Sequence, residues 1–488
     1  MIERWMFKTV EVWAVGLLCV AGFLAIILVS ALAREHAEGN RRFGPAGEAA
    51  HFLSMVPETI ASLGAQAIGG QKVVLAVTEE RFEGESGLAV HGDPDALRAE
   101  GYLLLSRYDG DRHRSLVELV DLAGGRIVHR WEPDFAAQNE RSEVVSSLTV
   151  VPRDNAPNRA RMFHPLLTPD GGLVFQNMTP LTRVDSCGRL DWLTQKLFHH
   201  SIEPHPEGGY LASAFLEPQT IEGVGRRFKE DAIVHVSDGG EILFERSVPA
   251  LLIANGHAHL VFGQDFYSDD PLHLNDVQYA PFDGPHWKKG DLFLSLRNVS
   301  AIVQYRPSTD EVVWMKQGPW VNQHDVDILD AHRIAIFNNN RFNGRHGAYV
   351  DGVNTVMVYD FATDSVSEPY RGAMERLDIR TISEGRSEIL SDGGVFIEES
   401  NYGRAVRLAA DGSLLWSFVN RAGDGRVYLL SWSRYIPKET GRAVLRALSE
   451  GGCAIPPEPA GSASRSPEAV QSRDLSVYKG LAAAGAAP

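Results

Sequence analysis

The sequence predicts an all-β protein, a six-bladed β-propeller that follows an N-terminal transmembrane or signal-anchor helix. Three observations lead to this prediction: an uncharged apolar run near the N-terminus, six similar segments of short strands and turns, and a turn-rich composition with 46 glycines and 25 prolines. Glycine and proline favour turns between short strands over long helices. A chain of 488 residues with 44% hydrophobic and 23% charged residues suits one large globular unit with appendages.

Residues 1–33 are expected to form the signal anchor or transmembrane helix. The 21 residues from Trp13 to Ala33 carry no charge, and this length can span a hydrocarbon core of about 30 Å. The run ends in Ala-Leu-Ala, which fits a signal peptidase site, so a cleaved signal peptide is the alternative to an uncleaved anchor. Under either interpretation, the remaining chain is expected in the periplasm or outside the cell, with the helix as its contact with the membrane.

Four regions follow from the change in composition along the chain. They are the helix at 1–33, a membrane-proximal helical connector at 34–71, the propeller at 72–440, and a C-terminal tail at 441–488. The end of the tail is rich in proline, alanine, serine and glycine, and such a composition cannot bury enough apolar surface to order a chain. We therefore expect the tail to be largely disordered.

The predicted propeller rests on six repeated segments. Each has a turn, a short apolar strand, a second strand, a turn with Asp or Gly, and a third strand that often ends near a tryptophan. The segments cover residues 101–131, 168–192, 205–245, 289–314, 331–366 and 391–416. Each sheet is too small to bury its own face, and radial stacking of such sheets forms a propeller. A β-sandwich would explain the alternation but not six similar units; the first strands are expected to join the last.

Charge and cysteine content exclude several classes of protein. The net charge of −16 is opposite in sign to the basic surface of a nucleic-acid binder, so no nucleic-acid partner is expected. Three cysteines are too few for a disulfide scaffold or a cysteine-rich metal site. Cys187 and Cys453 are both predicted outside the cytoplasm, where they can pair or stay free, and the sequence does not decide between these states.

The histidines are unevenly distributed along the chain. Eleven of the 17 lie between His199 and His346, and the last 142 residues contain none. A single buried histidine commonly satisfies a hydrogen bond in the core, and His199 and His205 suit that role as well as a chemical one. As a group, however, these histidines fall at strand and loop junctions where the predicted blades begin, which places a candidate site on one rim.

Four fragments in this region carry a family resemblance. They are FHHSIEPHPEGG at 198–209, LHLNDVQY at 272–279, LSLRNVSAIVQY at 294–305 and NQHDVDIL at 322–329. In this order they resemble the signatures of the arylsulfotransferase (aryl-sulfate sulfotransferase) family: a His-His element before a glycine turn, His-x-Asn, Ser-x-Arg and Gln-His. Residues 385–416 also resemble the last full blade of that family. The resemblance covers about residues 160–435.

The resemblance implies a six-bladed propeller with its site in the central channel. Members of the family move a sulfuryl group from a phenolic sulfate ester to another phenol, without a nucleotide sulfate donor, through a sulfohistidine intermediate. The partners implied are thus a small aryl sulfate and a phenol, with no cofactor and no metal; the oligomeric state is open. The residues that match the family's site are His324 as nucleophile, His273 and Asn275 of His-x-Asn, Arg297 of Ser-x-Arg, and His200, for which His199 is the alternative.

The chemistry of these side chains agrees with sulfuryl transfer. The reaction resembles phosphoryl transfer, in which charge spreads over equatorial oxygens and catalysis depends on positioning and on fixed positive donors. The guanidinium of Arg297 offers a planar fork for two oxygens, and the amide of Asn275 is a further donor. A neutral imidazole is a competent nucleophile near neutral pH. A second histidine, His273 or His200, can protonate the departing phenolate or deprotonate the incoming phenol.

This sequence departs from the family pattern at two places, and other functions compete. Ser201 stands where the family often has Asp, and residues 315–318 (Met-Lys-Gln-Gly) replace a frequent Leu-Gly-Gly. A noncatalytic membrane-anchored propeller that acts as a scaffold or binding module is the main alternative. A metal site is another, with ligands drawn from His257, His259, Asp265, Asp269 and Asp270. A quinone-dependent propeller oxidoreductase is disfavoured because its tryptophan-docking repeats are missing.

Overall fold

The computed structural model describes residues 11–37, 41–54, 56, 75–77, 79–91, 97–263, 267–344, 347–453, 455 and 457–460. Much of the predicted connector and residues 461–488 of the predicted tail lie outside the described residues. Within the connector, a short 3₁₀ helix η1 (Arg41–Phe43) precedes helical residues 44–54.

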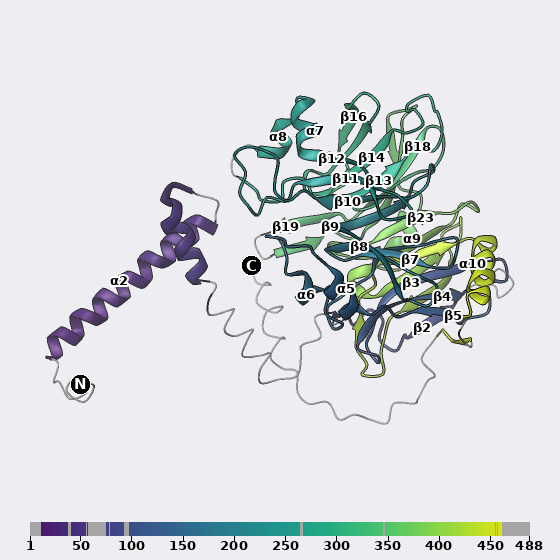
Figure 1. The fold of residues 1–488 in the computed structure, drawn as a ribbon, viewed down its shortest axis with the longest axis horizontal. Helices are drawn as coiled ribbons and strands as arrows, with labels where there is room; N and C mark the ends of the chain where they lie inside the picture. Colours follow the sequence, from purple (N-terminus) through teal and green to yellow (C-terminus); the bar gives the residue numbers. More distant parts are fainter. Residues whose placement is uncertain are drawn as a thin grey trace.

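The uncharged N-terminal run forms helix α2 (Val12–Ala37), as the sequence predicts. Its apolar side chains are almost all exposed, and Figure 1 shows the helix extending away from the β-sheet body. Among the described residues, α2 is the one helix that is long and apolar enough to cross a membrane. An apolar helix without a protein partner needs an apolar medium around it, so α2 suits a signal anchor or a membrane span.

The rest of the described chain is mostly antiparallel β-sheet. Four sheets have four or five strands, which in hydrogen-bonded order are β13 (Leu274–Tyr279), β14 (Leu292–Leu296), β15 (Ala301–Arg306) and β16 (Glu311–Gln317); β17 (Val326–Ile328), β18 (Arg333–Asn338), β21 (Thr355–Asp360) and β22 (Ser365–Ser367); β2 (Gly87–Val90), β26 (Leu414–Val419), β25 (Arg404–Leu408), β24 (Val395–Glu399) and β23 (Arg386–Ile389); β28 (Arg434–Ile436), β3 (Tyr102–Asp109), β4 (Arg114–Asp121), β5 (Arg126–Trp131) and β29 (Glu458–Pro459). Two strand pairs complete this set: β19 (Arg341–Gly344) with β20 (Gly347–Val350), and β1 (Ala76–Val77) with β27 (Val427–Tyr428).

A fifth large sheet is continuous over seven strands. In order these are β12 (Ile242–Ser247), β11 (Asp231–Val236), β10 (Tyr210–Phe215), β9 (Leu190–Pro204), β8 (Thr179–Val184), β7 (Leu173–Gln176) and β6 (Phe163–Leu167). The first part of the 15-residue strand β9 pairs with β8 and its last part pairs with β10, the change occurring at Phe198. The fold is therefore all-β and propeller-like, with four blade-like sheets and one longer sheet, and the count of six blades stays a prediction.

Strands from the two ends of the sheet body pair with each other, as expected for a closed ring. The late strand β28 pairs with the early strand β3, and the early strand β2 pairs with the late strand β26. Such pairs of distant segments leave fewer free sheet edges.

The predicted repeats correspond to the three outer strands of each unit. The segment 101–131, for example, contains β3 to β5, and the segment 391–416 contains most of β24 to β26. The innermost strands β28, β6, β13, β17 and β23, and the last part of β9, fall between the repeats and complete them.

Side chains on these innermost strands join one strand to the next around the centre of the molecule. Four backbone N–H groups donate to a side chain of the preceding innermost strand at 3.1–3.2 Å: Ile202 to Nδ1 of His164, Val277 to Oγ of Ser201, Val326 to Oδ2 of Asp276, and Ser387 to Oδ2 of Asp325. Arg386 then donates to the carbonyl of Ser433 at 3.3 Å, and Arg434 donates to that of Pro165 at 3.0 Å. The interior along these strands is therefore polar and held by hydrogen bonds.

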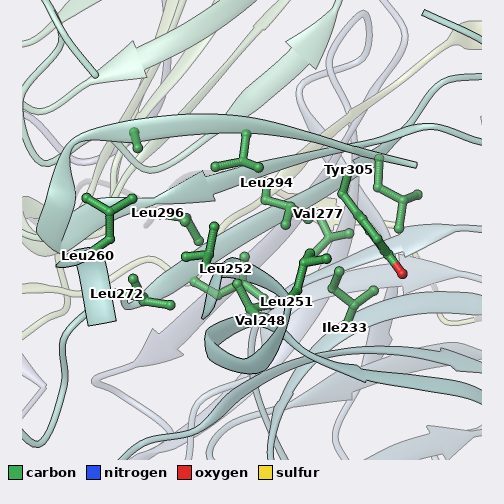
Figure 2. Packing of buried hydrophobic residues seen from close by; sticks show 14 of the residues in the cluster. Ile233, Val248, Leu251, Leu252, Leu260, Leu272, Val277, Leu294, Leu296 and Tyr305 are labelled. Carbon is green, nitrogen blue, oxygen red and sulfur yellow. The ribbon is translucent and has the colours of Figure 1, made fainter. Parts of the chain in front are cut away.

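Apolar cores lie farther out, where neighbouring sheets face each other. The largest cluster packs residues of β11, β13, β14 and β15 against helices α7 (Val248–Ala254) and α8 (Ala258–Phe262), and Figure 2 shows Val248, Leu251 and Leu252 of α7 against Leu294 and Val277. Burial of each such side chain stabilises the fold by about 1.5–3 kcal/mol. The shorter helices α5 (Phe135–Arg141), α6 (Val151–Asp154) and α9 (Arg371–Arg376) and the 3₁₀ turns η2 (Arg297–Val299) and η3 (Ser400–Tyr402) connect strands.

The predicted tail at 441–488 is wrong for its first part. Residues Lys438–Glu450 form helix α10, which packs the buried side chains of Val444 and Leu448 into the cluster around Tyr102. Glu458 and Pro459 then add a strand beside β5. An amphipathic pattern at helical spacing accounts for this order, because it supplies the apolar face that a disordered tail lacks. Between these two elements, Cys453 is joined to Cys187 by a disulfide whose Cα atoms lie 5.2 Å apart.

Candidate active site

Four large side chains sit at unusual backbone positions where innermost strands begin. His164 and His200 lie within β6 and β9, and His273 and Trp432 precede β13 and β28 by one and two residues. All four have positive φ angles, between 45° and 62°. The strand register shifts beside each of the three histidines, and a bulge of this kind re-aims a side chain. Bulky residues rarely adopt this conformation, so the fold holds them there at some cost.

The indole of Trp432 is the centre around which the histidines gather. Its ring centroid lies 5.1 Å from that of His164, 6.0 Å from His324 and 6.4 Å from His200. His200 in turn lies 4.8 Å from His273. Three predicted site residues from β9, β13 and the segment before β17 thus come together. The sequence analysis missed Trp432, because it lies outside the repeats and only its rarity near the end of the sheet body could have marked it.

His324 is buried, with one ring nitrogen engaged and one bare. Its Nδ1 lies 2.6 Å from Oδ1 of Asn339, while the amide nitrogen of Asn339 donates to the carbonyls of Thr381 and Glu384. The oxygen of that amide therefore faces the imidazole, which places the ring proton on Nδ1. Within the part of the chain that the structure describes, Nε2 of His324 has no hydrogen-bond partner, so its lone pair is available.

Electrostatics keep His324 neutral. Burial lowers its pKa well below the ordinary value of 6.5, and the positive charge of Arg297 lowers it further. A neutral imidazole with a bare Nε2 is the form that a nucleophile requires. Asn339 is a second residue that sequence reasoning missed, although the run Asn338-Asn339-Asn340 directly after β18 could have drawn notice.

His273 belongs to a charged triplet with Asp270 and Lys229. Its Nδ1 lies 2.7 Å from Oδ2 of Asp270, and Nζ of Lys229 lies 2.8 Å from the same oxygen. Burial acts to raise the pKa of Asp270, but the hydrogen bond from His273 and the charge of Lys229 outweigh it and lower that pKa. The carboxylate is therefore ionised, and it can stabilise a proton on His273.

His200 is tied to a different partner. Its Nδ1 lies 2.8 Å from Nδ1 of His199, and Nε2 of His199 lies 3.4 Å from the buried carboxylate of Asp231. Burial, then the charge of His273, lowers the pKa of His199 to about 3. Neutral His199 with its proton toward Asp231 accepts from His200, which leaves Nε2 of His200 as the unprotonated nitrogen.

Arg297 begins the 3₁₀ turn η2 directly after β14, and its backbone N–H donates to the carbonyl of His273 at 3.1 Å. The described residues provide no carboxylate in salt-bridge contact with its guanidinium, and its buried Nε lacks a hydrogen-bond partner among them. Burial, and then the charge of Arg341, lower the pKa of Arg297. An unpaired guanidinium of this kind is suited to bind an anion.

Asn275 lies under the nucleophile and is fully buried. Its amide nitrogen donates to the carbonyl of Gln323 at 3.0 Å. The side chain of Gln323 donates to Oγ of Ser295 and to the carbonyls of Leu296 and Ala301. Asn275 and Gln323 thus fix the backbone that carries His324, and one amide hydrogen of Asn275 is already used in doing so.

The residues that depart from the family pattern lie close by. Ser201 accepts a hydrogen bond from the N–H of Val277, so it joins β9 to β13. Gln317 donates to the carbonyl of Val299 in the turn that carries Arg297, and Lys316 forms an ion pair with Asp364 on the outside.

His205 lies apart from this cluster. Its ring stacks on that of His235 at 3.9 Å and packs edge-on against Tyr279. For the alternative metal site, the rings of His257 and His259 lie 6.1 Å apart, and Asp265 lies outside the described residues. In the described ranges, no three His, Cys, Asp or Glu side chains converge as ligands for a metal ion.

Comparison with known proteins gives one family. Residues 179–421 match the family model described as Arylsulfotransferase (ASST). This range contains β8 to β26, and it includes His200, His273, Asn275, Arg297 and His324. No curated protein matches the chain.

Solved structures with a similar outline have little sequence in common with this chain. A crystal structure of a protein of unknown function from Bacteroides caccae is 11% identical, covers 68% of this chain and 98% of its own, and has a TM-score of 0.42. The WD40 beta propeller domain of Doa1 is 11% identical over 68% of this chain and 94% of its own, with a TM-score of 0.34. Virginiamycin B lyase from Staphylococcus aureus is 11% identical over 68% and 88%, also with a TM-score of 0.34.

Proposed function

Because residues 179–421 of this chain belong to the arylsulfotransferase family, we propose that the protein transfers a sulfuryl group from an aryl sulfate ester to a phenolic acceptor through a sulfohistidine at His324. The observation that carries this proposal is the bare Nε2 of His324 next to the guanidinium of Arg297, which no described carboxylate neutralises. A nucleophile with an adjacent unpaired cation suits a substrate that presents an anionic electrophile.

In the first half-reaction, the Nε2 lone pair of His324 attacks sulfur. The N–S bond forms as the S–O bond to the aryl group breaks, and the leaving phenolate takes a proton. The imidazole keeps its Nδ1 proton, so positive charge develops on the ring, and the amide oxygen of Asn339 at 2.6 Å stabilises that charge. Arg297 stabilises the negative charge that spreads over the sulfuryl oxygens.

In the second half-reaction, the oxygen of the acceptor phenol attacks the same sulfur and gives up its proton. The N–S bond breaks, its electron pair returns to Nε2, and neutral His324 is restored. Donor and acceptor thus use the same pocket in turn, and one proton is lent and recovered in each cycle.

His273 is the residue that we assign to this proton transfer. The ionised carboxylate of Asp270 lies 2.7 Å from Nδ1 of His273, so an imidazolium at His273 has a counter-charge. His200 has a neutral histidine in the equivalent place, at 2.8 Å. The Asp–His pair therefore supports His273 as acid and base, and His200 as the side chain that orients the phenol oxygen.

We also propose that the ring has six blades and spans roughly residues 72–440. The continuous seven-stranded sheet divides at Phe198 of β9, where pairing passes from β8 to β10. Hydrogen bonds link β6, the last part of β9, β13, β17, β23 and β28 in sequence and return to β6 through Arg434. Six innermost strands in one cycle support six blades.

The same proposal places the propeller outside the cytoplasm, with residues 1–33 as anchor and 34–71 as connector. The disulfide between Cys187 and Cys453 supports this placement, because disulfides persist in the periplasm and outside cells.

Intact mass after incubation with 4-nitrophenyl sulfate tests the enzyme proposal against the noncatalytic scaffold. The parent protein is expected to gain one sulfuryl group and to release nitrophenol, and His324→Ala is expected to do neither. Arg297→Lys should retain the fold but lose much of the rate, because the planar fork becomes a point charge. An His324→Ala protein that transfers sulfate at the parent rate would sink the assignment.

A further inference from the structure

A polar cavity of about 600 Å³ adjoins the proposed site on the side of Asp270. Asp270, which holds His273, forms part of its wall, as does Asn322, two residues before His324. The other walls come from α8, from the turn at Asn298, and from the hairpin of β19 and β20. A molecule that reacts at His324 can therefore extend into this cavity, whose size suits a small aromatic substituent.

Arg341 is the unexplained charge in this cavity. It begins β19, and its backbone carbonyl accepts a hydrogen bond from the amide of Asn322 at 3.1 Å, which fixes the base of the hairpin beside the site. Its Nε is buried, and neither that atom nor the rest of its guanidinium has a hydrogen-bond or carboxylate partner among the described residues. A partly buried cation without a partner is costly unless a ligand supplies one.

The surrounding charges favour an anion there. Lys229 and the hydrogen bond from His273 already occupy Oδ2 of Asp270, so this carboxylate is neutralised by its own partners. The charge of Arg341 acts on Arg297 across the site. The amides of Asn298, Gln317 and Asn322 spend their N–H groups on backbone carbonyls. Arg341 is therefore left as the strongest free donor in the cavity wall.

We propose that Arg341 binds a second anionic group of the substrate, so that this enzyme prefers aryl sulfates and phenols that carry a carboxylate, phosphate or further sulfate. This inference rests on the proposed sulfotransferase function and specifies its substrate class. Arg297 then takes the sulfuryl group that is transferred, and Arg341 takes the anionic substituent that is not. Two separated guanidiniums can select a dianionic substrate over a monoanionic one through charge-assisted hydrogen bonds.

The test compares 4-carboxyphenyl sulfate with its uncharged counterpart, 4-carbamoylphenyl sulfate, in kcat/KM for phenol release. The parent protein should favour the carboxylate by about tenfold, which is the effect of one charge-assisted hydrogen bond. Arg341→Gln should abolish this preference and leave the carbamoyl substrate within about twofold of the parent. Arg341→Lys should retain part of it, since a point charge remains. Arg333→Gln is the matched control, because Arg333 pairs with Asp330 on the surface and should leave the preference unchanged.

Failure of the inference and failure of the enzyme proposal give different results. If the parent protein turns over both esters and Arg341→Gln leaves their ratio unchanged, the role of Arg341 is wrong and the sulfotransferase stands. If neither ester is turned over, the enzyme proposal fails. Equilibrium binding of 4-hydroxybenzoate against 4-hydroxybenzamide then tests the site without turnover. Equal affinities in the parent protein would overturn it, as would equal loss of both ligands in Arg341→Gln with an unchanged melting temperature.

Discussion

Nδ1 of His273 and Oδ2 of Asp270 lie 2.7 Å apart, and the same oxygen accepts from Lys229 at 2.8 Å. The three residues come from the loop before β13 and from the segment before β11. Their arrangement fixes the imidazole so that Nε2 faces the other histidines, and it supplies a negative charge that is itself held in place. A histidine so placed can exchange a proton without moving.

Asp270→Asn should therefore impair proton transfer selectively. We expect a loss of about 10²-fold in turnover of phenyl sulfate, whose leaving group needs a proton. The loss should be much smaller for 4-nitrophenyl sulfate, whose leaving group is stable as an anion. Steady-state rates on the two esters measure this difference. A loss of equal size on both would show that Asp270 only supports the fold.

Asn339→Ala should slow formation of the sulfohistidine. Without its partner, the imidazole of His324 can place its proton on either nitrogen, and the developing positive charge loses its acceptor. A decrease of about 10- to 100-fold in single-turnover phenol release is expected, as for other orienting partners of a reacting histidine. Asn139→Ala is the matched control, because Asn139 also donates to two backbone carbonyls, those of Pro152 and Asn155, away from the site. Equal rates in the two variants would contradict the assigned tautomer.

The rate of the first half-reaction should be insensitive to mild acid. Burial and the charge of Arg297 hold the pKa of His324 well below 6.5. A lowered pKa means that the proton is taken up only at lower pH, so the nucleophile stays neutral as the pH falls through 6.5. Single-turnover release from 4-nitrophenyl sulfate should change less than about twofold between pH 7.5 and 5.5, where an ordinary histidine would lose about tenfold. A midpoint near 6.5 would argue against His324 as the attacking group.

Loss of the disulfide should destabilise the protein. Cys187 and Cys453 are 266 residues apart in sequence and tie the segment after α10 to the turn between β8 and β9. Cys453→Ser should lower the free energy of unfolding by about 2–5 kcal/mol, measured by urea denaturation under oxidising conditions. Cys19→Ser, in α2, is the control and should leave the urea midpoint unchanged. If reductant shifts the parent no more than it shifts Cys453→Ser, the bond is absent in solution.

Much of the outer fold could be predicted from sequence because outer strands face apolar neighbours. The alternation in the segment 101–131 marks β3 to β5, and the uncharged run marks α2. Helix α10 was missed because the low-complexity end of the chain masked the short amphipathic pattern before it. The innermost strands were also missed: they face a polar interior, and residues such as Ser201, Asp276 and Asp325 give no apolar period to detect.

By itself, the sequence determined the chemical types at the site, the order of the motifs and the all-β class, since these are local properties of the chain. Only the tertiary structure decided which groups meet. The contacts of Trp432 with His164, of His199 with Asp231, and of His273 with Lys229 join segments from different strands. The tautomer of His324 and the unpaired charge of Arg341 likewise depend on neighbours brought close by sheet packing. Burial and distance set the protonation state and the free partners of a side chain, and both arise only when the sheets assemble around one centre.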